Sequence, residues 1–240
     1  MSTDQSGPIQ RIKLLKTAPH ACSYLDGKEA STAFVDPELA IDSDLYARLS
    51  ENGFRRSGPY IYTPMCGDCI ACVSARIPVD LFAHSRSQRR CVKANSDLTV
   101  TCLNSIDVVE HYAVYADYIN HRHADGDMYP PTTEQFVDFL GTAWDCTQFV
   151  EFRIGTKLIG CAIIDVLPDA VSAIYTYFDP IEERRGLGNF AVLYQIAMAK
   201  ELALSHVYLG YWIEDCKKMS YKRQYQPIEL LQGNTWKLSE

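Results

Sequence analysis

The chain has 240 residues, a length that suits one large domain or two small intertwined ones. Hydrophobic residues make up 47% and charged residues 22%, which is typical of a folded globular protein and argues against a disordered chain. The formal net charge of −7 argues against a protein that coats nucleic acid non-specifically, although it leaves room for a local basic patch.

The N-terminal stretch MSTDQSGPIQRIKLLK lacks the continuous apolar run of a secretory signal. No stretch approaches the ~20 apolar residues that a membrane span needs. We therefore expect a cytoplasmic protein that has no membrane partner. In that compartment the nine cysteines are interpreted as thiols or metal ligands rather than as a disulfide framework.

The first half of the chain predicts short strands and helices in alternation. Asp42 or Ser43 can cap a helix over 42–53, in which Leu45 and Leu49 recur at helical spacing. The other expected elements are a turn and short strand within 20–37, strands over 54–63, 73–79 and 97–103, and helices over 85–96 and 107–121.

The second half predicts a different order. After a helix over 133–140, strands are expected over 148–154, 157–167 and 170–178, then a helix over 187–204 and a strand over 206–212. An antiparallel meander followed by a helix and a strand resembles the acetyltransferase-like (GNAT) core. We therefore predict an α+β fold with a GNAT-like lobe over 106–240 and a mixed, cysteine-containing N-terminal lobe over 1–105. The lobes should form one compact unit, because no Pro/Gly/Ser linker separates them.

Three cysteines recur at two-residue spacing in C-G-D-C-I-A-C, which lets successive thiolates turn toward one centre. A fourth sulfur from Cys22 would complete a site for structural or regulatory zinc or an iron–sulfur cluster. The alternative is a loop of partly buried thiols without metal. The candidate ligands are Cys22, Cys66, Cys69 and Cys72, whereas Cys102, Cys146, Cys161 and Cys216 lie in apolar or helical patterns and are interpreted as core residues.

A basic segment, HSRSQRRCVK at 84–93, contains no acidic residue. Arg86, Arg89, Arg90 and Lys93 follow the spacing i, i+3, i+4 and i+7, so a helix presents all four on one face. Such a face can bind phosphates. The alternative is a solvated surface without a ligand.

The sequence E-R-R-G-L-G at 183–188 opens the long helix. In acetyltransferases the equivalent turn holds the pyrophosphate of acetyl-CoA at the helix N-terminus. Gly186 and Gly188 fit that pattern, but Glu183 would repel a pyrophosphate, which favours a donor other than CoA. The alternative is a simple helix-capping turn.

Five spaced motifs together resemble the aminoacyl-tRNA–protein transferases, over roughly residues 19–237. Leu25 and the spaced cysteines are more similar to the bacterial branch that transfers leucine than to the eukaryotic branch that transfers arginine. The motifs are C-S-Y-L at 22–25, G-F-R-R-S-G with C-G-D-C-I-A-C within 53–72, S-R-S-Q-R-R at 85–90, Y-T-Y-F-D-P with R-R-G-L-G within 175–188, and Y-L-G-Y-W-I-E-D-C-K-K-M-S-Y-K at 208–222.

The resemblance implies that charged tRNA, Leu-tRNA in this branch, donates its amino acid to proteins whose N-terminal residue is Asp or Glu. The product would enter N-degron proteolysis, and the chemistry would need no cofactor. Arginine as the transferred residue is the alternative within the family. Arg184 and Arg185 join Arg86, Arg89, Arg90 and Lys93 as expected tRNA contacts.

An aminoacyl-tRNA ester is already activated, so the enzyme has mainly to align the ester with the acceptor amine and to assist proton transfer. The candidates for catalysis are Asp179, Tyr175, Tyr177 and Tyr211, and packing within strands is the alternative for each tyrosine. The candidates for binding the acceptor's carboxylate are Arg55, Arg76, Lys218 and Lys222, because a cation there would match its charge.

Two other functions compete with this hypothesis. One is an acetyl-CoA-dependent N-acetyltransferase, which would bind CoA. The other is a non-enzymatic, metal-binding RNA or protein adaptor, which would bind tRNA without forming a product.

Overall fold

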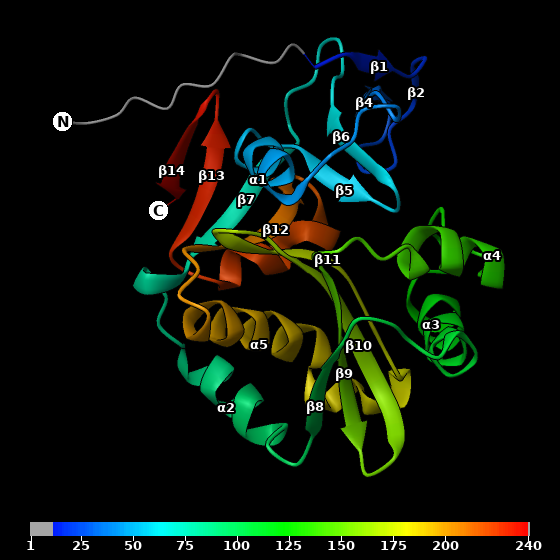
Figure 1. Ribbon diagram of the computed structural model, residues 1–240, viewed down its shortest axis with the longest axis vertical. Coiled ribbons are helices and arrows are strands. Elements are labelled where there is room, and N and C mark those ends of the chain that lie inside the picture. Colours follow the sequence, from blue (N-terminus) through cyan, green and yellow to red (C-terminus); the bar gives the residue numbers. More distant parts are fainter. Residues whose placement is uncertain (1–11, 240) are drawn as a thin grey trace.

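An eight-stranded sheet forms the centre of the computed structural model, which describes residues 12–239 (Figure 1). Its order is β14-β13-β7-β12-β11-β10-β9-β8, and the described neighbours pair antiparallel except for β11 and β12, which are parallel. The strands are β7 (Val73–Pro78), β8 (Thr99–Leu103), β9 (Thr147–Ile154), β10 (Lys157–Val166), β11 (Ala170–Phe178), β12 (His206–Trp212), β13 (Ile228–Gln232) and β14 (Thr235–Ser239).

The predicted order of meander, helix and strand is confirmed. β9, β10 and β11 are antiparallel neighbours, α5 (Leu187–Glu201) follows, and β12 returns beside β11. The meander begins with a tight turn at Gly155, whose φ of +56° favours glycine. β10 is buried at nearly every position because helices cover both faces of the sheet.

Helices pack on both faces of this sheet (Figure 1). One face carries α5 with α2 (Arg86–Ala94), where the predicted Ser85 cap forms a capping box with Gln88. The other face carries α3 (Val108–Arg122) and α4 (Thr133–Phe136). The helix predicted over 133–140 differs in kind, because α4 continues as a π-helix, η2 (Val137–Gly141).

A second, four-stranded sheet with the order β1-β4-β6-β5 lies above the first in Figure 1, with α1 (Ser43–Glu51) packed on it. Asp42 caps α1 as expected, accepting from the Leu45 amide at 2.8 Å. The single strand predicted over 54–63 is wrong, since the chain reverses at Gly58 (φ +55°) and forms a hairpin. The strands are β1 (Leu14–Lys16), β4 (Thr32–Val35), β5 (Arg55–Ser57) and β6 (Tyr60–Pro64), beside a separate pair of β2 (His20–Ala21) and β3 (Glu29–Ala30).

The two halves of the chain share the large sheet. β7 lies between β12 and β13, and β8 forms an edge beside β9, so strands from before and after residue 105 belong to one sheet. The C-terminal hairpin of β13 and β14 lay outside the sequence-based expectations. Short helices complete the fold, namely η1 (Val79–Leu81), η3 (Pro180–Arg185) and η4 (Lys217–Gln224). None of the described helices is long and apolar enough to span a membrane.

Candidate active site

A cavity opens where the parallel strands β11 and β12 separate. Their paired residues run only from Ala170 and His206 to Ser172 and Tyr208. Beyond that point a β-bulge and the left-handed Gly210 (φ +78°) redirect β12. The cavity has a volume of about 510 Å³ and lies between β11, the end of α3, the start of α5 and η4.

The glycine turn forms one wall of this wedge-shaped cavity. Gly186, with a φ of +65°, ends η3 and begins α5, and Gly188 and Asn189 line the cavity. α2 fixes the turn from outside, since Asn95 Nδ2 donates to the Arg185 carbonyl at 2.9 Å. Glu183 is exposed and does not line the cavity, so its carboxylate is not one of the charges in the cavity wall.

Three basic side chains line the wedge cavity. Arg122, His123 and Lys218 belong to its wall, and none of the described lining residues is an Asp or Glu. Burial, followed by the charges of Lys218 and Arg122, lowers the pKa of His123. A neutral imidazole at pH 7 can accept a proton. Sequence reasoning missed Arg122 and His123, because basic residues at a helix C-terminus are what the helix dipole favours in any protein.

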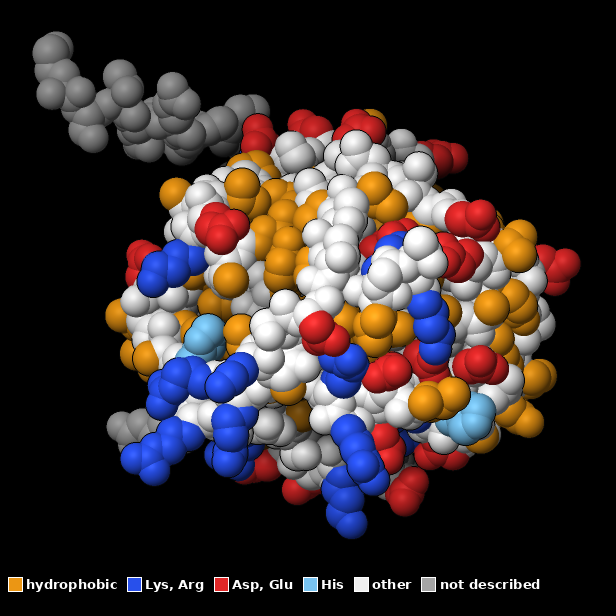
Figure 2. Space-filling view, turned by 90° about the horizontal axis from the view of Figure 1, so that it is seen from below, with side chains coloured by type: hydrophobic (Ala, Val, Ile, Leu, Met, Phe, Trp, Pro, Cys, Tyr) orange, Lys and Arg blue, Asp and Glu red, His pale blue; other side chains and the backbone are white. Residues whose placement is uncertain are grey.

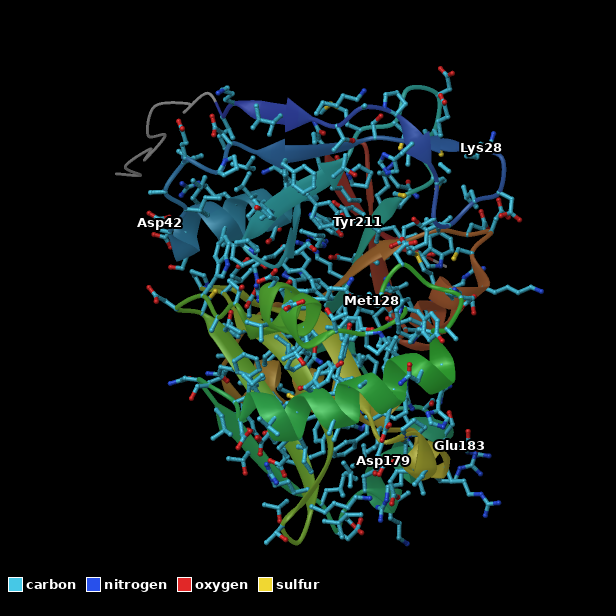
Figure 3. All side chains as sticks on the ribbon, turned by 90° about the vertical axis from the view of Figure 1, so that its right-hand side faces the viewer. Lys28, Asp42, Met128, Asp179, Glu183 and Tyr211 are labelled. Atoms are coloured by element: carbon cyan, nitrogen blue, oxygen red, sulfur yellow. The ribbon has the colours of Figure 1, made fainter. Side chains whose placement is uncertain are left out.

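Of the four predicted catalytic residues, Tyr175 alone lines the wedge cavity. Asp179 accepts from Lys157 Nζ at 2.8 Å and from the Ile181 amide at 3.0 Å, and it borders a separate, smaller hollow. Figure 3 shows Asp179 and Tyr211 on opposite sides of α3. The structure therefore does not bring these candidates together.

Tyr177 and Tyr211 are held by hydrogen bonds within the protein. Tyr177 is buried, and its hydroxyl lies 2.6 Å from Nδ1 of His111, whose Nε2 lies 2.8 Å from Glu151. Burial raises the pKa of the Tyr177 hydroxyl, so it is protonated at any physiological pH. The Tyr211 hydroxyl donates to the Gly53 carbonyl at 2.8 Å. Both tyrosines have the contacts expected of strand packing.

The four candidates for acceptor binding have different environments. Arg76 is paired with Glu51 and Glu229, each at 2.6 Å. Lys218 lies at the cavity wall and pairs with the exposed Asp125 at 2.8 Å. Arg55 and Lys222 are both buried. Arg76 therefore has its charge satisfied, whereas Arg55 and Lys222 donate to neutral carbonyls.

The predicted basic face of α2 is exposed. Arg86, Arg89, Arg90 and Lys93 all face solvent, and Figure 2 shows Lys and Arg side chains gathered on that side of the molecule. α2 also touches the cavity wall, since Gln88 Nε2 donates to the carbonyl of Gln224. Arg184 is also exposed, but Arg185 forms ion pairs with Asp97 and Glu182, each at 2.8 Å.

Cys22, Cys66, Cys69 and Cys72 lie near one another. Burial raises the pKa of the Cys72 thiol to about 11, and the thiols of Cys66, Cys22, Cys69 and Cys216 raise it further. Between Ile12 and Ser239, however, no three His, Cys, Asp or Glu side chains are arranged to hold a metal ion. The zinc or iron–sulfur site suggested by the cysteine spacing therefore stays a prediction.

A second cavity of about 590 Å³ adjoins the first, and Met128 lines both. It lies between the β5–β6 turn and the π-helix, where a Cβ on Gly58 would meet the Asp138 carbonyl oxygen at 2.8 Å. Its wall combines Tyr115, Met128 and Phe139 with Asp127 and Asp138. In Figure 3 Met128 lies between Tyr211 and α3.

Comparison with known proteins matches the sequence of this chain to one family. Residues 20–90 match the sequence model described as "Arginine-tRNA-protein transferase, N terminus", and residues 110–232 match the corresponding C-terminus. The chain therefore belongs to the arginine-tRNA-protein transferase family and is an aminoacyltransferase, which confirms the resemblance.

Curated relatives narrow this class further. A protein from Saccharophagus degradans is 50% identical over 229 residues, covering 95% of this chain and 97% of its own. One from Pseudomonas syringae pv. tomato is 49% identical, again covering 95% and 97%. One from Teredinibacter turnerae is 48% identical, covering 95% and 94%. All three are named aspartate/glutamate leucyltransferase.

Proposed function

We propose that this enzyme transfers leucine from Leu-tRNA to the N-terminus of proteins that begin with Asp or Glu, and so marks them for N-degron proteolysis in the cytosol. The observation that carries the proposal is the basic lining of the wedge cavity in a protein of net charge −7. The acetyltransferase-like core would supply the wedge cavity, and the β5–β6 turn would contribute to the adjoining second cavity.

The tRNA would bind along the positively charged surface that leads to the wedge cavity. The phosphates of the tRNA 3′ end would lie along the exposed face of α2, whose Gln88 contacts the cavity wall at Gln224. The terminal adenosine and its ester would then occupy the wedge beside Gly188. Counterion release at Arg86, Arg90 and their neighbours would provide much of the affinity.

The leucyl group would extend into the second cavity. Tyr115, Met128 and Phe139 offer an apolar surface to its isobutyl side chain, and Asp127 or Asp138 can accept from its α-ammonium. Because Met128 lines both cavities, the ester carbonyl would lie close to this residue.

The reaction needs alignment more than activation. The acceptor amine attacks the ester carbonyl carbon, so that a C–N bond forms and the bond to the terminal ribose oxygen breaks. Holding both partners in place can lower the barrier by about 7–11 kcal/mol. His123 would take the proton from the amine and pass it to the ribose oxygen, and Arg122 or Lys218 would stabilise the oxyanion between these steps.

A donor comparison tests this function. The protein is incubated with a peptide beginning with Asp and with radiolabelled Leu-tRNA, Arg-tRNA or acetyl-CoA. We expect labelled peptide from Leu-tRNA alone, and none after RNase treatment of the donor. Label from acetyl-CoA would support the N-acetyltransferase, and tRNA binding without labelled peptide would support the non-enzymatic adaptor.

A further inference from the structure

Two buried cations, Arg55 and Lys222, lie close together without a carboxylate. Their residues are only 4% and 6% exposed. The charge of Arg55 acts on Lys222 and, after burial, is the second cause of its lowered pKa. Across residues 12–239 neither side chain forms an ion pair, whereas the buried Arg56 and Arg76 both do.

The partners of both cations are neutral carbonyls. Arg55 Nη1 donates to the carbonyls of Ser50 and Phe54 at 2.9 and 2.6 Å, and Lys222 Nζ donates to the carbonyl of Tyr211. The bond to Ser50, in the last turn of α1, has a structural explanation, because a cation stabilises a helix C-terminus. It accounts for one nitrogen of the guanidinium only.

The other edge of Arg55 is unsatisfied. Its Nε and Nη2 are buried and have no hydrogen-bond partner among residues 12–239. These two atoms form the edge of a guanidinium that grips a carboxylate with two parallel bonds. Arg56, the next residue, uses that same edge on Asp165, with Nε to Oδ2 at 2.6 Å and Nη2 to Oδ1 at 2.9 Å. A buried guanidinium with unsatisfied N–H groups lowers the stability of the fold unless an anion binds to it.

The pair lies beside the wedge cavity. Lys222 belongs to η4, whose Lys218 and Tyr221 line the cavity, and its ammonium lies 3.8 Å from where a Cβ on Gly210 would be. Gly210 follows Leu209, which also lines the cavity. The Arg55 guanidinium lies 4.7 Å from the centre of the Tyr208 ring on the same strand. An anion bound here would be next to the ester.

We propose that Arg55 and Lys222 together bind the side-chain carboxylate of the acceptor's N-terminal Asp or Glu. This inference rests on the proposed function and selects two of the four basic candidates. The carboxylate occupies the Nε–Nη2 edge of Arg55 and the Lys222 ammonium, and the acceptor's α-amine then points into the cavity. Since both cations are nine-tenths buried, a covering side chain moves when the acceptor enters.

The test compares acceptors that differ only in charge. Peptides beginning with Asp or with its neutral isostere Asn are measured with Leu-tRNA, using wild type, Lys222→Met and the control Lys200→Met, which changes an exposed lysine on α5. We expect Lys222→Met to raise KM for the Asp peptide at least tenfold and to lower the Asp-over-Asn preference by a similar factor. KM for Leu-tRNA should stay within twofold, and Lys200→Met should match wild type.

Other outcomes would overturn the assignment. An unchanged Asp-over-Asn preference in folded Lys222→Met would do so, and so would a rise in KM confined to Leu-tRNA, which would place a tRNA phosphate at the pair. If Lys222→Met does not fold, Arg55→Lys, which keeps the charge but offers no two-pronged edge, is measured in the same way with the same expectation. Absence of leucine transfer by wild type would instead refute the proposed function.

Discussion

Arg55 and Arg56 are consecutive residues of β5, yet within the described part of the chain only Arg56 pairs with a carboxylate. Alternate residues of a strand point to opposite faces, so the two guanidinium groups reach different surroundings. Arg56 reaches Asp165 at the end of β10, with Tyr46 and Thr147 completing the network. Arg55 reaches the rings of Tyr208 and Tyr211. One arginine therefore joins the two sheets, while its neighbour keeps a free binding edge.

The Arg56–Asp165 pair should be essential for stability. Both side chains are almost completely buried, at 1% and 0% exposure, so Arg56→Leu leaves an unpaired carboxylate in the interior. We expect a loss of about 3–5 kcal/mol in the free energy of unfolding, measured by urea denaturation. Lys13→Met, which breaks an ion pair with a 70% exposed lysine, should change it little. Similar losses in both variants would contradict this view.

His123 should carry the proton-transfer step. Replacing it with Gln removes the acceptor, so kcat for leucine transfer should fall by about 10² or more. The control is His121→Gln, an exposed residue two positions earlier on α3.

The pH profile gives a second test of His123. Its pKa lies below the ordinary 6.5, so the neutral form predominates above that pH and is lost as the pH falls through the lowered value. Wild type should therefore show an acid limb in kcat below pH 6.5, and His123→Gln should lack it. An unchanged limb in the variant would assign the proton transfer elsewhere.

The exposed face of α2 should govern affinity for tRNA. Arg86→Ala and Arg90→Ala should each raise KM for Leu-tRNA and lower the slope of log KM against log salt concentration by about 1, because each removes one phosphate contact. KM for the acceptor peptide should not change. Lys13→Ala, beside β1 in the other sheet, serves as the control. An equal rise in KM for Leu-tRNA in this variant would indicate that the α2 face is a solvated surface without a specific tRNA contact.

Lys222 should make acceptor binding sensitive to alkaline pH. Burial, then the charge of Arg55, lowers its pKa to about 8, while Cys216 opposes the shift. The ammonium is charged below that value and neutral above it, so the Kd of an Asp peptide, measured calorimetrically without donor, should rise above pH 8. In Lys222→Arg the guanidinium stays charged, and this rise should disappear. A wild-type Kd that stays constant to pH 10 would contradict the assignment.

Local patterns in the sequence were sufficient for the second half of the fold. The apolar runs of β9 to β11, the turn at Gly155 and the long α5 each depend on neighbouring residues, and all form as expected. The hairpin of β5 and β6 was missed although Ser57-Gly58-Pro59 is a local turn signal. The close packing of Gly58 on the Asp138 carbonyl, which is remote in sequence, is visible only in the fold. The position of β7 between β12 and β13 likewise depends on long-range pairing.

The site was less accessible to sequence reasoning. The basic face of α2 follows from helical spacing, and it is exposed as expected. Tyr175 and Tyr177 are two residues apart, so the strand pattern predicts that both side chains point to the same face. Of the two, only Tyr175 lines the cavity, because His111 of α3 covers Tyr177. The sequence does not distinguish Arg55 from Arg76. The fold shows that Arg76 already forms ion pairs with Glu51 and Glu229.

The most direct measurement is a crystal structure of the protein with a stable leucyl-adenosine amide. We expect the adenosine in the wedge between β11 and β12, the linking carbonyl near Met128 and His123, and the leucyl side chain against Phe139. An analogue bound away from this wedge, or coenzyme A binding there in preference to it, would contradict the proposed donor site.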